Sequence, residues 1–211
     1  MKYFSIVICL LFSVASANAQ HYPDNEPFKV GLNAGLNLTS VLGGELQNPG
    51  LKYGFVVGMY YRQPIKAIKN NHIQFDLRAS FRGSTFSNKG DDHYRKMHLF
   101  YVDAPLMDYI QLGKDGKHFL LAGAQYSQLV NSLMFIHPVG ERPISEGIAL
   151  KNYDISALLG YHFNGYYSGV SMVLTAGLVD INNGLNLPNV FPATGTNKPI
   201  RNTSFSILVY F

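Results

Sequence analysis

The stretch that decides the fold is the end of the chain, residues 201–211, which read RNTSFSILVYF. Its residues alternate between two faces, and period-two alternation predicts a β-strand. A last strand that ends on an aromatic residue is typical of bacterial outer-membrane barrels, in which it pairs with the first strand and closes the sheet. We therefore predict that one face of this strand closes the barrel and serves as its assembly signal: Phe205, Ile207, Val209 and Phe211.

Seven further segments have strand character. The clearest is 72–82, where Ile73, Phe75, Leu77, Ala79 and Phe81 alternate with polar residues. The others are 29–39, 54–62, 97–112, 118–130, 152–163 and 167–180, and Pro105 predicts a bulge or frayed pairing within its strand. Connections after the second, fourth and sixth strands are short or moderate, whereas the others are mostly longer, as in outer-membrane barrels. The sequence predicts an all-β fold over 29–211: an eight-stranded antiparallel transmembrane β-barrel, an up-and-down meander of the OmpA/OmpX type.

Alternation alone does not separate a membrane barrel from a soluble lipocalin-like barrel. Here the apolar faces carry so many large residues that they would overfill a small barrel interior, whereas the opposite faces are mostly Gly, Ser and Asn. We therefore expect the apolar faces to contact lipid. This register turns four charged residues inward as a structural network in the lumen: Asp76, Arg78, Arg82 and Asp103. A buried charge needs a partner, and we hypothesise that Arg78 pairs with Asp103 on the next strand.

The N-terminus has the features of a signal peptide. Lys2 precedes an apolar segment, 4–14, and Ala17-Asn18-Ala19 fits the small-x-small cleavage pattern. We predict a cleaved signal peptide over 1–19, a periplasmic extension over 20–28, and export to the outer membrane. A retained anchor is less favoured because the polar residues HYPDNEP follow at once. The single cysteine, Cys9, lies inside the signal, which leaves no thiol in the mature chain and disfavours lipidation.

Composition narrows the classes of function. The net charge of +4 becomes 16 − 13 = +3 when Lys2 is removed, and the basic residues are scattered, so no nucleic-acid partner is expected. Mild basicity suits contact with outer-membrane lipid and lipopolysaccharide, and assembly would involve the barrel-assembly machinery. The seven histidines form no His-x-His or His-x-x-x-His pair, so we expect neither a metal nor a cofactor. Ser156 and His162 share a face but lie about 20 Å apart along the strand, and no enzyme is expected.

Two long connections, 131–150 and 182–199, carry apolar side chains. Such residues in outer loops suggest contact with another outer-membrane or periplasmic protein. Folding back over the barrel mouth, or into the lipid headgroups, is an equally good interpretation. The candidate contact residues are Met134, Phe135, Ile136, Leu187 and Phe191.

Three segments resemble the PorT-like outer-membrane β-barrel family. Residues 101–106, YVDAPL, are similar to its Tyr-x-Glu/Asp-x-Pro-Leu signature, with Asp103 where many members have Glu; 154–160 (DISALLG) and 177–182 (GLVDIN) resemble its later motifs. The resemblance implies a barrel in a Gram-negative envelope, and some members serve type IX secretion and gliding. We therefore expect a non-catalytic structural or accessory subunit of an envelope complex. A narrow pore and a lipid-modifying enzyme are the alternatives.

Overall fold

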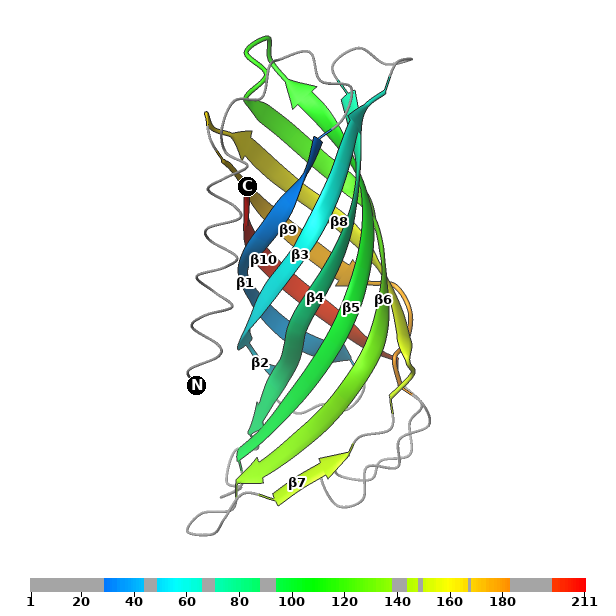
Figure 1. The fold of residues 1–211 in the computed structure, drawn as a ribbon. Coiled ribbons are helices and arrows are strands. Elements are labelled where there is room, and N and C mark those ends of the chain that lie inside the picture. Colours follow the sequence, from blue (N-terminus) through cyan, green and yellow to red (C-terminus); the bar gives the residue numbers. More distant parts are fainter. Residues whose placement is uncertain are drawn as a thin grey trace.

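The computed structural model describes residues 29–43, 49–65, 71–87, 94–137, 144–147, 150–166, 168–182 and 199–211. They form one antiparallel sheet that curls into a barrel (Figure 1). Its strands are β1 (Lys29–Gly43), β2 (Pro49–Gly50), β3 (Lys52–Pro64), β4 (Asn71–Ser87), β5 (Tyr94–Leu112), β6 (His118–His137), β7 (Ile144–Gly147), β8 (Tyr153–Asn164), β9 (Gly169–Gly177) and β10 (Ile200–Tyr210). The described ranges contain no helix of the length and hydropathy needed to cross a membrane. The predicted signal peptide and N-terminal extension lie outside the described residues.

The barrel closes between its first and last strands. β10 pairs with β1 from Asn33↔Tyr210 to Gly43↔Ile200, and the seam is extended by hydrogen bonds between Phe211 and Leu32 in both directions, at 2.9 and 3.2 Å. The long strands β1, β3, β4, β5, β6, β8, β9 and β10 each pair with the next, whereas β2 and β7 are short additions to β4 and β6. The predicted eight-stranded antiparallel barrel and its closure by the last strand are confirmed.

Five strands, β1, β3, β4, β5 and β6, are longer than the sequence pattern predicted. β4 continues to Ser87, β5 begins at Tyr94, and β6 continues to His137, so placing a loop from residue 131 was wrong. The polar pair Asn131 and Ser132 interrupts the alternation, and the run of four apolar residues that follows, 133–136, does not restore it. Figure 1 shows the ends of β4, β5 and β6 projecting beyond the other strands at the long-loop end, with β7 along the edge of β6.

Proline interrupts one ladder, as predicted. β4 and β5 pair at Phe75↔Leu106 and again at Arg78↔Asp103, but not in between, where Pro105 lies. Proline has no N–H to donate to β4, which explains the gap. The irregularity between β5 and β6 falls elsewhere, between Phe100 and Tyr101.

The two faces of the barrel differ as a membrane requires. Phe205 and Ile207 are 37% and 46% exposed on the outside, whereas Ser204, Leu208 and Tyr210 are buried inside. The outer face carries a belt of large exposed apolar residues on all eight long strands, which water would disfavour and lipid accommodates. An aromatic row crosses β3, β4 and β5, with ring centroids 4.2 Å apart for Phe55 and Phe81 and 4.7 Å apart for Phe81 and Phe100. The prediction that the apolar faces point outward is therefore confirmed.

Two apolar clusters fill the two ends of the lumen. At the long-loop end lies the mouth cluster: Val41, Phe86, Met97, Leu99, Tyr101, Met134, Leu150, Ile181 and Ile200. Toward the short turns lies the turn-end cluster: Val56, Met107, Tyr109, Phe119, Leu121, Leu158, Val173, Leu208 and Tyr210. Polar and charged side chains occupy the space between them.

Candidate functional site

One polar network is centred on Asp76 of β4, which is fully buried. Its carboxylate accepts hydrogen bonds from Asn33 Nδ2 at 2.9 Å and Gln74 Nε2 at 2.7 Å, and it forms an ion pair with Arg78. Arg78 also donates to the Tyr210 hydroxyl on the closing strand at 2.9 Å. The network therefore ties β1, β4 and β10 together from the inside, across the closing seam.

Arg62 of β3 extends this network toward the short turns. Its Nε donates to Gln74 Oε1 at 2.6 Å, and its guanidinium lies over the Tyr109 ring at 4.0 Å from the centroid. A cation held against an aromatic face is stabilised even without a carboxylate. Arg62 is buried, and the contacts that stabilise its guanidinium are the hydrogen bond to Gln74 and the face of the Tyr109 ring.

A second network lies nearer the mouth and is centred on Arg82. Arg82 forms an ion pair with Asp103 at 2.5 Å, donates from Nε to Ser80 Oγ at 3.1 Å, and lies over the Tyr101 ring at 4.9 Å. On the facing strands, Asn202 Nδ2 donates to Asp154 Oδ2 at 2.9 Å and to the Tyr101 hydroxyl at 3.1 Å. The second network therefore connects β4 and β5 with β8 and β10.

The structure places all four predicted lumen residues inside the barrel, but it pairs them differently. Arg78 and Asp103 are direct partners in the β4–β5 register, yet Arg78 pairs with Asp76 and Asp103 pairs with Arg82. The proposed Arg78–Asp103 pair was wrong because Arg78 turns back along its own strand. Asp76 and Arg78 are two residues apart on one face, well within reach of a long guanidinium side chain.

Sequence reasoning missed Arg62 and Asp154. Both occupy positions that the alternation of their predicted strands assigns to the lumen, and this could have identified them. Each lies near the end of its strand, however, where the alternation is weakest. With them, the buried charged side chains of the described residues are three arginines and three aspartates: Arg62, Arg78, Arg82, Asp76, Asp103 and Asp154. Charge is therefore balanced inside the described part of the barrel.

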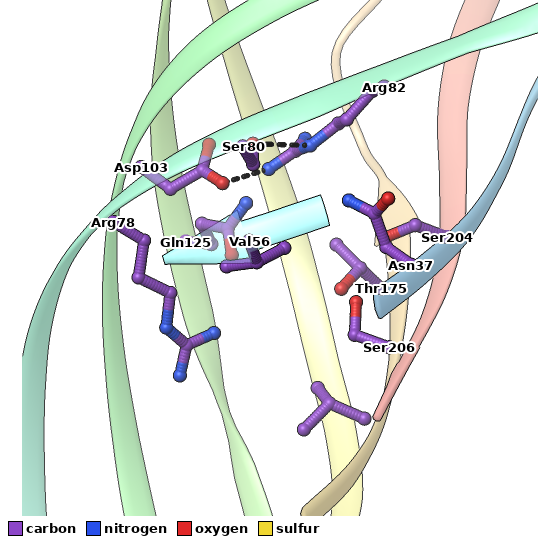
Figure 2. Close-up of a pocket in the computed structure, with 11 residues that line it drawn as sticks. Asn37, Val56, Arg78, Ser80, Arg82, Asp103, Gln125, Thr175, Ser204 and Ser206 are labelled. Carbon is purple, nitrogen blue, oxygen red and sulfur yellow. Dashed lines mark hydrogen bonds and ion pairs between the residues drawn. The ribbon is translucent and has the colours of Figure 1, made fainter. Parts of the chain in front are cut away.

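A small cavity separates the two networks. Its volume is about 10 Å³, which is about the space that one water molecule needs. Figure 2 shows Arg78 and Asp103 on one side of the cavity and Asn37, Ser204 and Ser206 on the other. Asn37 Oδ1 and Asp103 Oδ1 are buried and lack a hydrogen-bond partner, so a water molecule here would satisfy acceptors that the side chains leave open.

One contact has the chemistry of a catalytic pair. His162 Nδ1 lies 2.7 Å from Ser171 Oγ, across the β8–β9 ladder. The His162 ring packs edge-on against Tyr109 and Tyr210, with centroids 5.3 and 5.4 Å away. Ser156, the serine considered from the sequence, is buried without a hydrogen-bond partner. Within the described residues there is no group of three or more His, Cys, Asp or Glu side chains that could hold a metal ion.

The predicted contact residues fall into three groups. Met134 was expected on an outer loop, but it is buried in the mouth cluster because β6 extends past it. Phe135 and Ile136 also belong to β6, and the Phe135 ring packs edge-on against His98 at 5.0 Å. Leu187 and Phe191 lie outside the described residues.

The mouth is covered partly by connecting segments. Leu150 and Ile181 are buried in the mouth cluster although neither lies in a strand. Backbone hydrogen bonds hold this cover: Lys151 N donates to Ile181 O at 2.9 Å, and Ile181 N donates to Ile200 O at 2.9 Å. At Leu150 and Ile181 the chain therefore folds over the lumen.

Comparison with known proteins identifies the fold. No family model matches the chain, and no curated protein matches it. The crystal structure of Neisserial surface protein A (NspA) matches with a TM-score of 0.51 and 10% identity, covering 88% of this chain and 98% of that one. The attachment invasion locus protein Ail of Yersinia pestis gives a TM-score of 0.46 and 12% identity, covering 88% of this chain and 97% of that one. The likeness to NspA shows that the chain has the fold of an eight-stranded outer-membrane barrel.

Proposed function

We propose that this protein is a non-catalytic outer-membrane barrel that acts as a structural or accessory subunit of a cell-envelope complex. The observation that carries the proposal is the filled lumen. Two polar networks, whose buried arginines and aspartates balance in charge when taken together, occupy its middle, and the mouth and turn-end clusters lie at its two ends. A barrel packed in this way offers its outer face and its projecting strands for function, and these are surfaces for contact with other molecules.

The resemblance of residues 101–106 to the PorT-like signature supports a role in secretion or gliding for that complex. In the barrel this segment lies on β5 and contributes Tyr101 and Asp103 to the second network. In this chain the signature residues therefore stabilise the lumen, and the link to secretion rests on the resemblance alone. A deletion strain would lose secreted substrates from the culture medium if the link is correct, and normal secretion would refute it.

A narrow pore is a weaker candidate because the cavity between the networks has room for about one water molecule. Recordings in planar bilayers test this directly. We expect no discrete conductance steps from the purified barrel. Reproducible steps that disappear when Arg82 is replaced would favour the pore instead.

A lipid-modifying enzyme is favoured by one contact, the Ser171–His162 pair, since a histidine beside a serine can activate it as a nucleophile. Both side chains are buried, at 0% and 1% exposure, and aromatic rings surround the histidine. A lipid ester has no approach to Ser171 in this arrangement. Unchanged lipid A on overexpression supports the non-catalytic proposal, and altered lipid A that requires Ser171 would overturn it.

The decisive test of the proposal is affinity purification of the tagged protein from outer membranes in mild detergent. We expect a partner protein in stoichiometric amount, identified by mass spectrometry. An unrelated tagged barrel expressed at the same level is the control for non-specific capture. A barrel that is recovered alone from native membranes would contradict the accessory role.

A further inference from the structure

Asp108 is a carboxylate on the lipid-facing side of the barrel. Its neighbours along β5, Met107 and Tyr109, are buried in the turn-end cluster, so Asp108 has the opposite, outward parity. Leu106, the preceding residue on the outer face, is 50% exposed. Asp108 is paired in register with Ile73 of β4 and Ala122 of β6, which are both apolar.

The surroundings of Asp108 do not satisfy its charge. Phe75 on β4 and Leu120 on β6 are among the exposed apolar residues that flank it on the outer face. Its Oδ1 atom is buried and has no hydrogen-bond partner. It interacts electrostatically with His72, whose ring contacts Phe119 at the turn-end cluster. An ionisable group in an apolar belt is costly, and in membrane proteins such groups usually mark functional sites.

The outer face beside Asp108 is made of small residues. Ala124 of β6 pairs directly with Ala157 of β8, which pairs with Ala176 of β9. Ala122 adjoins this row and is the register partner of Asp108. Larger side chains stand around it, including Tyr126 and Leu159, which are 47% and 56% exposed. Because alanine side chains are short, another backbone can come closer to the barrel wall along this row than at the larger residues around it.

We infer that the outer face of β5, β6 and β8 around Asp108 is a docking surface for a membrane-spanning segment of another protein, which presents a lysine or arginine to the Asp108 carboxylate. The inference rests on the proposed accessory role and specifies where the partner binds. Charge complementarity selects the occupant, because a cation offsets the cost of a carboxylate that faces lipid. A second copy of this chain fits less well, since a two-fold contact centred here would bring two like charges together.

The first experiment compares partner recovery by Asp108→Leu, Asp108→Asn and a matched control, Asp115→Asn. Asp115 is an exposed carboxylate in the turn between β5 and β6, outside the apolar belt. We expect the leucine variant to recover at least about tenfold less partner, because an unpaired cation would remain in the interface. The Asp115 variant should recover the wild-type amount. The isolated Asp108→Leu barrel should be at least as resistant to urea as wild type, which excludes misfolding as the cause.

The second experiment places a photo-crosslinking amino acid at Ala124, in the row, or at Leu36 of β1, which is 68% exposed on the opposite side of the barrel. We expect a protein crosslink from position 124 and none from position 36. Crosslinks to lipid alone, or to a second copy of the chain, would overturn the assignment. If wild type recovers a partner but Asp108→Leu recovers it equally well, this inference fails while the accessory role stands. If wild type recovers none, both fail.

Discussion

Replacing Asp76 by Asn is the sharpest test of the lumen networks. The carboxylate is fully buried, pairs with Arg78, and accepts hydrogen bonds from Asn33 and Gln74. An Asn side chain has nearly the same shape but no charge, and its amide nitrogen cannot accept a hydrogen bond. The variant therefore leaves the Arg78 guanidinium buried without its counter-ion, while Arg62 adds a second positive charge nearby through Gln74.

The expected cost follows from breaking a buried ion pair by removing one partner, about 3–5 kcal/mol in the free energy of unfolding. Replacing Arg78 by Met in the same chain removes the stranded charge. The double variant should therefore be more stable than the sum of the single changes predicts, with a coupling energy of about 2–3 kcal/mol. The same cycle on Arg78 and Asp103 should couple by less than about 1 kcal/mol, although the two residues are direct register partners.

Urea titration in phospholipid vesicles, followed by far-ultraviolet circular dichroism, measures these free energies. Circular dichroism suits this chain because it has no tryptophan to report unfolding. A parallel cycle on Arg82 and Asp103 is the positive control, since these two form the other ion pair. A coupling for Arg78 and Asp103 that exceeds the coupling for Arg78 and Asp76 would refute the assignment of partners.

Three further predictions concern the wall of the barrel. Ile207→Arg, on the lipid-facing side of β10, should lower the free energy of unfolding in vesicles by about 2–4 kcal/mol, whereas Ile207→Val should change it little. Gly54→Ala should lower the free energy of unfolding by about 3 kcal/mol in the same urea titration, because the added Cβ would overlap the Phe81 carbonyl oxygen. Gly116→Ala is the control. Its added Cβ has open space around it, and only the backbone φ of +66° is unfavourable for alanine, so the cost should be about 1 kcal/mol. Phe211→Ala should slow assembly of the barrel in cells, measured as heat-modifiable protein in pulse-chase gels. Refolding in detergent should be unchanged, because the backbone hydrogen bonds between residue 211 and Leu32 remain. Equal slowing in both assays would contradict a role as assembly signal.

The barrel could be predicted from the alternation of apolar and polar residues, because a side chain in a barrel wall has only two possible environments. Each residue of 72–82 faces lipid or lumen, so one run of Ile73, Phe75 and Leu77 fixes the orientation of its strand. The strand ends were harder to predict. Residues 131–137 continue β6 beyond the belt, where neither face must be apolar, and the pattern there carries less information.

The ion-pair partners inside the lumen could not be predicted from the face of the strand on which each residue lies. Asp76, Arg78 and Arg82 share one face of β4, and Asp103 faces them from β5, so several pairings were geometrically open. The choice depends on groups from distant strands. Asn33 and Tyr210 bind the Asp76–Arg78 pair from the closing seam, and Ser127 lies 3.4 Å from Arg82 on the far side of Asp103. Each of these contacts joins strands that are not neighbours in the sheet, and the Tyr210 contact lies across the closing seam, so no local pattern encodes them.

The aspartates of the lumen and the aspartate on the outer face differ in whether the barrel itself supplies a partner for their charge. Inside, each buried aspartate accepts a hydrogen bond from a named donor, so the lumen charges are explained by the stability of the barrel. Asp108 faces the other way, toward lipid, and among the described residues it has no ion pair to explain it. A barrel selected for stability alone would gain from leucine at this position. The aspartate is therefore best explained by a molecule outside the barrel, and a stability gain in Asp108→Leu accompanied by loss of the partner is the combination of results that this argument requires.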